Sequence, residues 1–198
     1  MGNIDSVDII VLGTSYGGME TLTLLFSNLS EDFDIPIVIV YHRPRKSNSD
    51  YLVEYFSNCT DLVIEEISDC QKILSGHIYF APPDYHVLFE NKDTLILYMD
   101  KAVNHSRPSI DVLFQSGGQI YKNKIMGILL SGASSDGAKG ICFISEQGGF
   151  SMVQEPSTAI ASTMPQSAID LCFPDRVEDV KMIAFLMNES NAEYRKRK

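Results

Sequence analysis

The segment that most constrains the fold of this chain is residues 7–22, which reads as a strand, a tight turn and a helix. Residues 9–12, I-I-V-L, form a short apolar run typical of a strand buried on both faces of a parallel sheet. A glycine-rich stretch follows at residues 13–18, and from residue 19 to residue 29 apolar side chains recur at helical spacing. The chain therefore turns from strand to helix within a few residues, and Ser15 lies inside that turn.

Ser15 has three interpretations, which the turn alone leaves open. It can be an ordinary capping residue in the first turn of an α/β unit. It can belong to a dinucleotide-binding loop, although it occupies the second glycine position of G-x-G-x-x-G and so breaks that pattern. It can also be a nucleophile, since residues 13–17, G-T-S-Y-G, match the G-x-S-x-G turn that presents a serine to a nearby base.

A second buried strand is predicted at residues 37–41, and His42 follows it directly. With the helix between them, the two strands form a βαβ unit, whose strands are parallel and leave the same edge of the sheet. We therefore expect Ser15 and His42 to lie close together. A dinucleotide enzyme more often has Asp or Glu at the end of its second strand, so His42 also disfavours a nucleotide-binding function.

The pattern of the opening segment recurs near residue 130. Residues 125–130 form another buried strand, and residues 131–137, S-G-A-S-S-D-G, form a turn that places Asp136 at the corner before a helix. Taken alone, Asp136 could simply be a helix cap.

Ser15, His42 and Asp136 each follow a predicted strand, and the carboxyl ends of parallel strands share one edge of a sheet. A serine hydroxyl needs an imidazole to take its proton, and a carboxylate fixes the tautomer of that imidazole and stabilises its charged form. The three residues therefore predict a catalytic triad. Their order along the chain differs from that of the α/β-hydrolases, which predicts another fold with the same chemistry.

The remaining pattern predicts an α/β protein with a parallel sheet. A β-rich insertion covers residues 76–99, with a strand at 76–81 and a hairpin formed by 85–90 and 94–99; His77 and His86 are expected to be half-buried strand residues rather than catalytic ones. Ser109 is a candidate cap for the helix that follows it. Further elements are expected as helices at 49–59 and 177–187, as a short helix that follows residues 164–165 and runs through 170, and as strands at 62–67 and 150–154.

Composition limits the class of protein. A chain of 198 residues can form one α/β domain with a full core. Its formal net charge of −10 argues against nucleic acid as a partner, because phosphate binding needs basic patches. The basic residues 195–198 are expected to be a frayed end.

The cysteines and the hydropathy pattern indicate a cytoplasmic protein. The four cysteines are widely separated and form no C-x-x-C pair, so we expect reduced thiols, no metal site and no disulfide. The sequence contains no apolar run near 18 residues and no signal peptide, so no membrane insertion is expected.

Several motifs accompany the triad candidates in order along the chain. They are G-T-S-Y-G-G at 13–18, His42, G-H-I-Y-F-A-P at 76–82, R-P-S-I-D at 107–111, S-G at 131–132, D-G-A at 136–138 and M-P at 164–165. With these motifs the chain resembles, nearly from end to end, the catalytic domain of the CheB-type protein-glutamate methylesterases of bacterial chemotaxis. The resemblance implies a doubly wound, mainly parallel sheet flanked by helices, hydrolysis of γ-glutamyl methyl esters on receptor helices, some glutamine deamidation, no metal or cofactor, and Ser15, His42 and Asp136 as the triad.

Two positions depart from the family pattern. Tyr16 stands after the serine, where most members have a smaller residue, and its ring is expected to overhang the nucleophile. Residues 132–134, G-A-S, replace the usual Gly-Met-Gly before the aspartate. The backbone N–H groups of Tyr16 and Ala133 still qualify as oxyanion donors, and Thr14, Gly17 and Gly132 are expected to line the site together with Tyr16.

The resemblance also sets expectations for organisation and partners. Residues 1–198 are expected to form a single catalytic domain, without the receiver domain that commonly regulates the family. The expected partners are methylated cytoplasmic helices of chemoreceptors or another methyl-esterified protein, together with a separate regulatory protein. Three alternatives stay open: a catalytically weakened binding or regulatory module, an esterase with a different substrate, and a nucleotide-binding fold.

Overall fold

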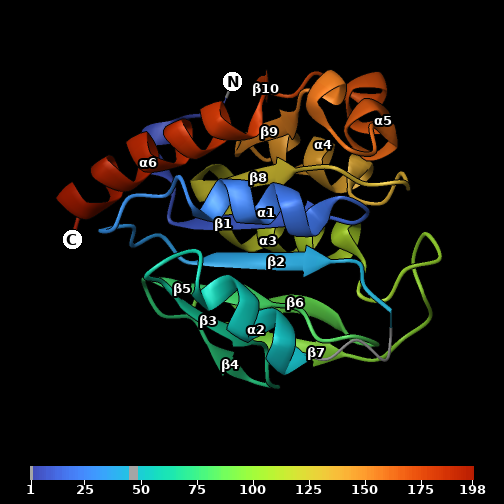
Figure 1. Cartoon of the computed structure of the whole chain (residues 1–198), viewed down its shortest axis with the longest axis horizontal. Coiled ribbons are helices and arrows are strands. Elements are labelled where there is room, and N and C mark those ends of the chain that lie inside the picture. The colour runs from blue at the N-terminus through green and yellow to red at the C-terminus, as the bar shows by residue number, and fades with distance from the viewer. Residues whose placement is uncertain (1, 45–48) are drawn as a thin grey trace.

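The computed structural model describes residues 2–44 and 49–198, and its centre is a seven-stranded sheet (Figure 1). All neighbouring strands in this sheet are parallel. In spatial order the strands are β10 (Arg176–Glu178), β9 (Phe150–Gln154), β8 (Ile125–Leu129), β1 (Ile9–Thr14), β2 (Ile37–Tyr41), β5 (His77–Phe80) and β3 (Val63–Glu66).

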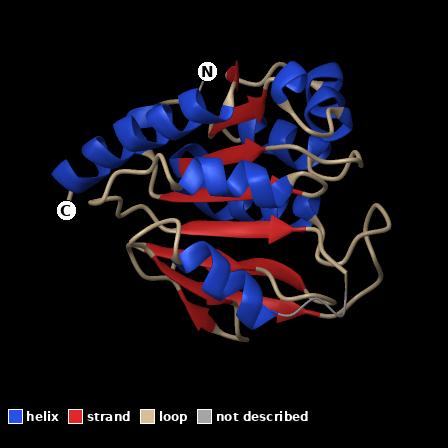
Figure 2. Cartoon of the chain, viewed as in Figure 1, coloured by secondary structure: helices blue, strands red, loops and turns tan. Residues whose placement is uncertain are grey.

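Helices cover both faces of the sheet, so the molecule has three layers (Figure 2). One face carries α1 (Gly18–Phe26), α2 (Ser49–Ser57) and α6 (Val180–Lys196), and the other carries α3 (Ile110–Tyr121), α4 (Ala138–Glu146) and α5 (Thr163–Leu171). Alternate residues of each central strand enter the two cores. In β1, Ile10 and Leu12 pack with the first group of helices, whereas Ile9 and Val11 pack with the second. This arrangement confirms the predicted fold class.

A second, smaller sheet is antiparallel and packs against α3, on the face of the main sheet that carries α3, α4 and α5. It contains β4 (Gln71–Lys72), β7 (Thr94–Tyr98) and β6 (His86–Asn91), so the predicted hairpin is confirmed. The expectation that residues 76–81 belong to this insertion is wrong. They form β5, which lies between β2 and β3 in the main sheet, where its Ile78, Tyr79 and Phe80 are buried.

The C-terminal residues also differ from the expectation. Residues 176–178 form the edge strand β10, and α6 begins only at Val180 and continues to Lys196. The tail packs against the N-terminal segment rather than fraying, because Arg197 donates hydrogen bonds to the backbone carbonyls of Asp5 and Val7. Lys198 pairs with Asp34 at 2.6 Å.

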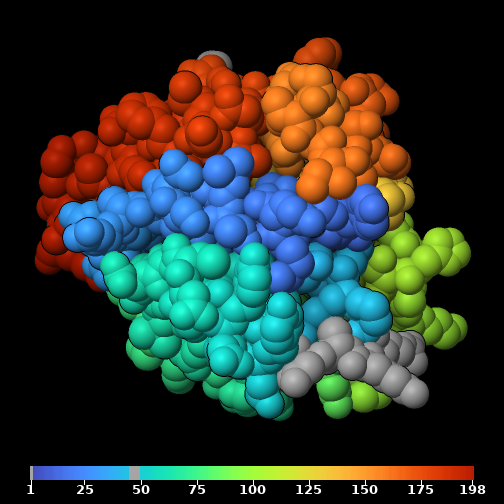
Figure 3. Space-filling model, viewed as in Figure 1, coloured from blue at the N-terminus to red at the C-terminus, as the bar shows by residue number. Residues whose placement is uncertain are grey.

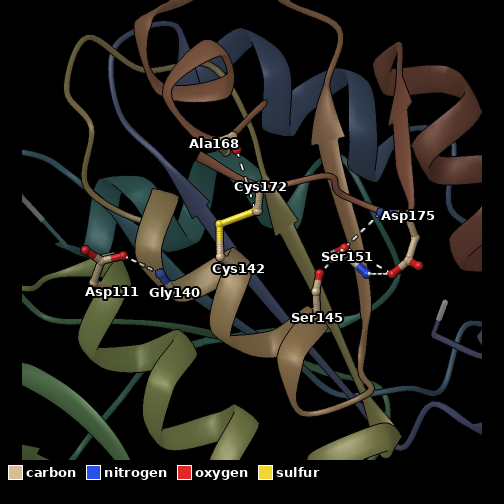
Figure 4. The surroundings of a disulfide bond; sticks show 8 residues. All are labelled: Asp111, Gly140, Cys142, Ser145, Ser151, Ala168, Cys172 and Asp175. Atoms are coloured by element: carbon tan, nitrogen blue, oxygen red, sulfur yellow. Dashed lines mark hydrogen bonds between the residues drawn. A yellow bond between two sulfur atoms is a disulfide. The ribbon is translucent and has the colours of Figure 1, made fainter. Parts of the chain in front are cut away.

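A disulfide joins Cys142 of α4 to Cys172, which directly follows α5 (Figure 4). The two Cα atoms lie 5.8 Å apart, and the cysteines are 30 positions apart in the sequence. The expectation of four reduced thiols is therefore wrong for this pair. The sequence gives no motif for the pairing, because it depends on how α5 packs across α4. Cys59 and Cys70 are free thiols.

Within residues 2–44 and 49–198, no helix combines the length and the apolar character that crossing a bilayer requires.

Candidate active site

The direction in which successive strands are added to the sheet reverses between β1 and β8. The candidate residues follow the strands on either side of this reversal. The chain runs outward through β2, β5 and β3 on one side and through β8, β9 and β10 on the other. Ser15 follows β1, His42 follows β2, and Asp136 lies in the loop after β8. Open α/β sheets place their sites at such a reversal, outside the carboxyl ends of the strands, the end to which the arrow of β2 points in Figure 1.

Backbone hydrogen bonds continue past the strand ends and fix the spacing of this edge. The N–H of His42 donates to the carbonyl of Thr14 at 3.0 Å, and the N–H of Ser15 donates to the carbonyl of Ser131 at 2.9 Å. Three segments far apart in the sequence are thereby held in register at the site.

Asp136 is fully buried and receives five hydrogen bonds. His42 Nε2 lies 2.9 Å from Oδ2. The backbone N–H of Ile110 also donates to Oδ2, and Oδ1 accepts from the Ser109 hydroxyl, the Asn104 amide and the N–H of Asp111, at distances of 2.7, 2.8, 3.0 and 3.3 Å respectively.

The carboxylate of Asp136 also closes the N-terminus of α3. Ser109 occupies the N-cap position, as predicted, but its side chain makes no capping bond and donates to Asp136 instead. The first two N–H groups of the helix, from Ile110 and Asp111, are satisfied by Asp136. The expectation that Asp136 could cap the helix after it is wrong, because α4 has Gly137 at its N-cap position and no side-chain capping bond. The carboxylate closes α3 instead, and it also contacts His42.

The electrostatic balance at Asp136 favours the ionised form. Burial alone would raise its pKa, but hydrogen bonds from His42, Asn104, Ile110 and Ser109 hold the pKa below the ordinary value of 3.8. Asp136 is therefore a carboxylate at neutral pH, the form that can orient and stabilise a protonated imidazole.

His42 and Ser15 are accessible from outside. The side chain of His42 is 14% exposed, and its ring contacts Asp136 through Nε2, which leaves Nδ1 for a second partner. Ser15 is half-buried. Among the described residues its hydroxyl has no hydrogen-bond partner, so Ser15 and His42 are not hydrogen-bonded to each other in this structure. Catalytic hydrogen bonds often form only when substrate is bound.

The residues predicted to bind the oxyanion or to line the site lie at the ends of β1 and β8 and in the turns that follow them. Tyr16 is 68% exposed, so its ring stands out from the turn. Ala133 is also exposed. Gly17 has a φ of 83° and no room for a side chain, because a Cβ atom would come within 2.6 Å of Ile160. A Cβ on Gly132 would collide with Met164 in the same way.

Thr14 and Ser131 hold this turn in place. The Thr14 hydroxyl is buried and donates to the carbonyl of Ser131 at 2.8 Å, so Thr14 acts from beneath the site rather than from its wall. The Ser131 hydroxyl donates to the carbonyl of Tyr16 at 2.8 Å and accepts from the N–H of Ala161 at 2.9 Å. Ser131 therefore links the serine turn to the loop before α5.

A cavity of about 270 Å³ opens beside His42. Arg43, His105 and Arg107 contribute polar groups to its wall. Arg107 is held in place by Asp84, at 3.4 Å, and by the carbonyl of Asp100, at 2.6 Å. The loop between β7 and α3 forms one side of this cavity and projects beyond the sheet edge, at the right of the surface in Figure 3.

Two residues important to this geometry were not predicted as site residues: Asn104 and Ser131. Asn104 donates to Asp136 from the loop before α3, and Ser131 acts through its hydroxyl and backbone. Asn104 stands just before the motif at 107–111, and Ser131 belongs to the S-G motif at 131–132, but neither motif identifies a contact.

The fold and this constellation define an α/β protein with a serine, a histidine and a buried aspartate at the switch point of its sheet. A model of the CheB methylesterase family matches residues 10–187, which is most of the chain. The chain belongs to the CheB methylesterase family, as its motifs predicted.

Individual relatives agree with this assignment. A protein of Leptospira interrogans is 39% identical over 191 residues, which cover 95% of this chain and 98% of that protein. The protein-glutamate methylesterase/protein-glutamine glutaminase of Thermotoga maritima is 30% identical over 85% of this chain, which spans only 50% of that protein. The crystal structure of the Thermotoga maritima CheB methylesterase catalytic domain matches with a TM-score of 0.86 and 29% identity, over 93% of this chain and 98% of that domain.

Proposed function

We propose that this protein is a serine hydrolase that demethylates glutamyl γ-methyl esters on chemoreceptor proteins, with Ser15, His42 and Asp136 as its catalytic triad. One observation carries the proposal: His42 contacts the buried carboxylate of Asp136 at 2.9 Å. This contact lies at the carboxyl ends of the strands, where Ser15 follows β1, the neighbour of β2. Membership of the CheB methylesterase family supports the substrate class.

In the proposed reaction, Ser15 Oγ attacks the ester carbonyl and its proton passes to Nδ1 of His42, while Asp136 stabilises the imidazolium through Nε2. The backbone N–H groups of Tyr16 and Ala133 bind the developing oxyanion. The bond to the methoxy group breaks, and His42 returns the proton to release methanol. Water then hydrolyses the γ-glutamyl ester of Ser15 and leaves a free glutamate.

The same steps applied to a glutamine side chain release ammonia, which gives the glutaminase activity we include in the proposal. All the proposed steps use side chains and backbone groups of this chain, with no metal or cofactor. We further propose that residues 1–198 act as one catalytic domain in the cytoplasm, on methylated receptor helices and under the control of a separate regulatory protein.

The decisive experiment measures methanol released from methylated receptor fragments, with p-nitrophenyl acetate as a small-ester comparison. We expect turnover of both, and we expect Ser15→Ala to lower both by a factor on the order of 10⁶ with an unchanged unfolding temperature. Activity retained in a folded Ser15→Ala protein would exclude Ser15 as the nucleophile.

The other outcomes identify the alternatives. Turnover of the small ester alone would indicate an esterase with a different substrate. Receptor binding without turnover of either ester would indicate a binding or regulatory module. A changed substrate or a loss of turnover would be explained by Tyr16 and Ala133, since both differ from the family pattern and both are exposed.

A further inference from the structure

Asn104 lies between two buried carboxylates. It occupies the loop between β7 and α3 with a φ of 50°, a left-handed conformation that asparagine tolerates better than most residues. Its side-chain nitrogen Nδ2 donates to Oδ2 of Asp111 at 2.7 Å and to Oδ1 of Asp136 at 3.0 Å. A carboxamide has two N–H groups, so each carboxylate can receive one of them.

The two carboxylates belong to one small cluster. Asp136 is fully buried, Asp111 is 3% exposed, and the backbone N–H of Asp111 itself donates to Asp136 at 3.3 Å. Asp111 Oδ1 also accepts the N–H of Gly140 at 2.7 Å, a bond that ties α3 to α4 (Figure 4). Without a donor between them, two buried carboxylates this close would compete for one proton, because like charges at one site raise the pKa of one partner.

We propose that Asn104 is a positioning residue of the triad: its amide bridges Asp111 and Asp136 and thereby keeps Asp136 ionised and directed at His42. This inference rests on the proposed triad. Asn104 acts through Asp136 and is not itself catalytic.

The charged surroundings of Asp136 are consistent with this role. His42 faces it from the end of β2 and Asp111 from α3. His86 of β6 accepts the N–H of Ser109 at 3.2 Å, and Lys139 of α4 lines a cavity together with Asn104 and Asp111. Burial raises the pKa of Asp111, whereas the pKa of Asp136 is lowered, so the pair is already asymmetric with Asp136 as the stronger acid.

The test compares Asn104→Gly with the wild type in the pH dependence of kcat and KM. Glycine removes the amide and accepts the left-handed backbone, so the loop is not strained. Lys122→Gly is the matched control, because Lys122 also has a positive φ, of 55°, but lies at the far end of α3. Asn104→Asp is the second variant, since it keeps the shape and replaces the donor with a third carboxylate.

We expect Asn104→Gly to lower kcat more at low pH than at high pH, about tenfold at the acid end of the profile and less than about twofold on its plateau, with KM unchanged. Loss of one hydrogen bond to the carboxylate raises the pKa of Asp136, so that the pair holds a proton over a wider acid range. The acid limb of the kcat profile should then depend on two protons instead of one, and Asn104→Asp should show the larger deficit. Lys122→Gly should keep the wild-type profile. An equal loss at every pH, or an unchanged profile, overturns the proposal.

NMR titration of the His42 ring separates this inference from the proposed function. In Asn104→Gly we expect a second inflection in the His42 signal, from the proton shared by Asp111 and Asp136, which the wild type lacks. If the wild-type protein hydrolyses no ester, the proposed function fails and this titration still decides the role of Asn104. A single inflection in both proteins would show that Asn104 does not set the charge of Asp136.

Discussion

Ile110 donates its backbone N–H to Oδ2 of Asp136 at 2.7 Å, and the same oxygen lies 2.9 Å from Nε2 of His42. One carboxylate therefore closes the N-terminus of α3 and holds the imidazole of the proposed triad. Because both contacts use one atom, a change that moves Asp136 affects the stability of the fold and the proposed chemistry together.

Asp136→Asn should lower both activity and stability. We expect a rate loss of roughly 10⁴, since an amide favours the wrong tautomer of the histidine. We also expect a loss of about 1–2 kcal/mol in the free energy of unfolding, because the amide keeps one acceptor oxygen but presents an NH2 group to donors that now bond to the other carboxylate oxygen. Ester hydrolysis and thermal unfolding measure the two effects. A wild-type rate with a lowered unfolding temperature would limit Asp136 to helix closure.

The stability difference between the wild type and Asp136→Asn should depend on pH. The pKa of Asp136 is lowered in the folded state, so its stabilising contribution is complete above the ordinary value of 3.8 and is lost as the pH falls through the lower, folded value. Unfolding temperatures measured from neutral pH downward should therefore converge for the two proteins below pH 3.8. A difference that stays constant through this range would contradict the charge-based explanation.

Short, continuous runs of apolar residues predicted the parallel sheet and the three strands after which Ser15, His42 and Asp136 lie. Such runs are typical of parallel strands that are buried on both faces. The edge strand β10 was missed since only three residues form it, between an exposed loop and a helix. The apolar residues of β5 read as part of the insertion because local pattern does not determine which sheet a strand joins.

Tyr16→Ala should change substrate preference more than chemistry. Tyr16 is 68% exposed and directly follows Ser15, whereas its backbone N–H is kept in any substitution other than proline. We expect kcat/KM for a helical receptor substrate to rise relative to kcat/KM for a small acetyl ester, because only the bulky substrate must pass the ring. The change should correspond to about 1–2 kcal/mol in activation free energy. An equal change for both esters would exclude steric gating, and a selective loss on the receptor would make Tyr16 a contact residue.

Reduction of the bond between Cys142 and Cys172 should destabilise the protein. A closed loop of 30 residues corresponds to about 3–4 kcal/mol in the chain-entropy model. For a domain of this size, this is a fall of about 6–15 °C in the unfolding temperature on addition of dithiothreitol.

A double variant, Cys142→Ser with Cys172→Ser, should show the same fall and no further response to the reductant. Cys59→Ser with Cys70→Ser is the matched control, because both of these thiols are free, and it should keep the full response. Four reactive thiols in the unreduced, denatured wild type would contradict the disulfide.

The supporting contacts of the site were beyond the reach of sequence patterns. Ser109 looked like the cap of its own helix, yet the cap comes from Asp136, a residue 27 positions away. Asn104 donates to two carboxylates, the Ser131 hydroxyl bonds two backbone groups of other segments, and both residues lie in loops, which carry no periodicity. Side-chain pairing across such distances depends on the assembled sheet rather than on local spacing.

Because Asp136 closes the N-terminus of α3, its presence and that of Ser15 mean different things when relatives of this chain are compared. A descendant that abandoned catalysis would still need a carboxylate at this position to close α3, so the presence of Asp136 carries little information about activity. Ser15 is different: within the described part of the chain all of its hydrogen bonds run through its backbone, and the fold does not depend on its hydroxyl. In an alignment of this family, replacement of the serine should mark the silent members, and replacement of the aspartate should be rare in both silent and active ones.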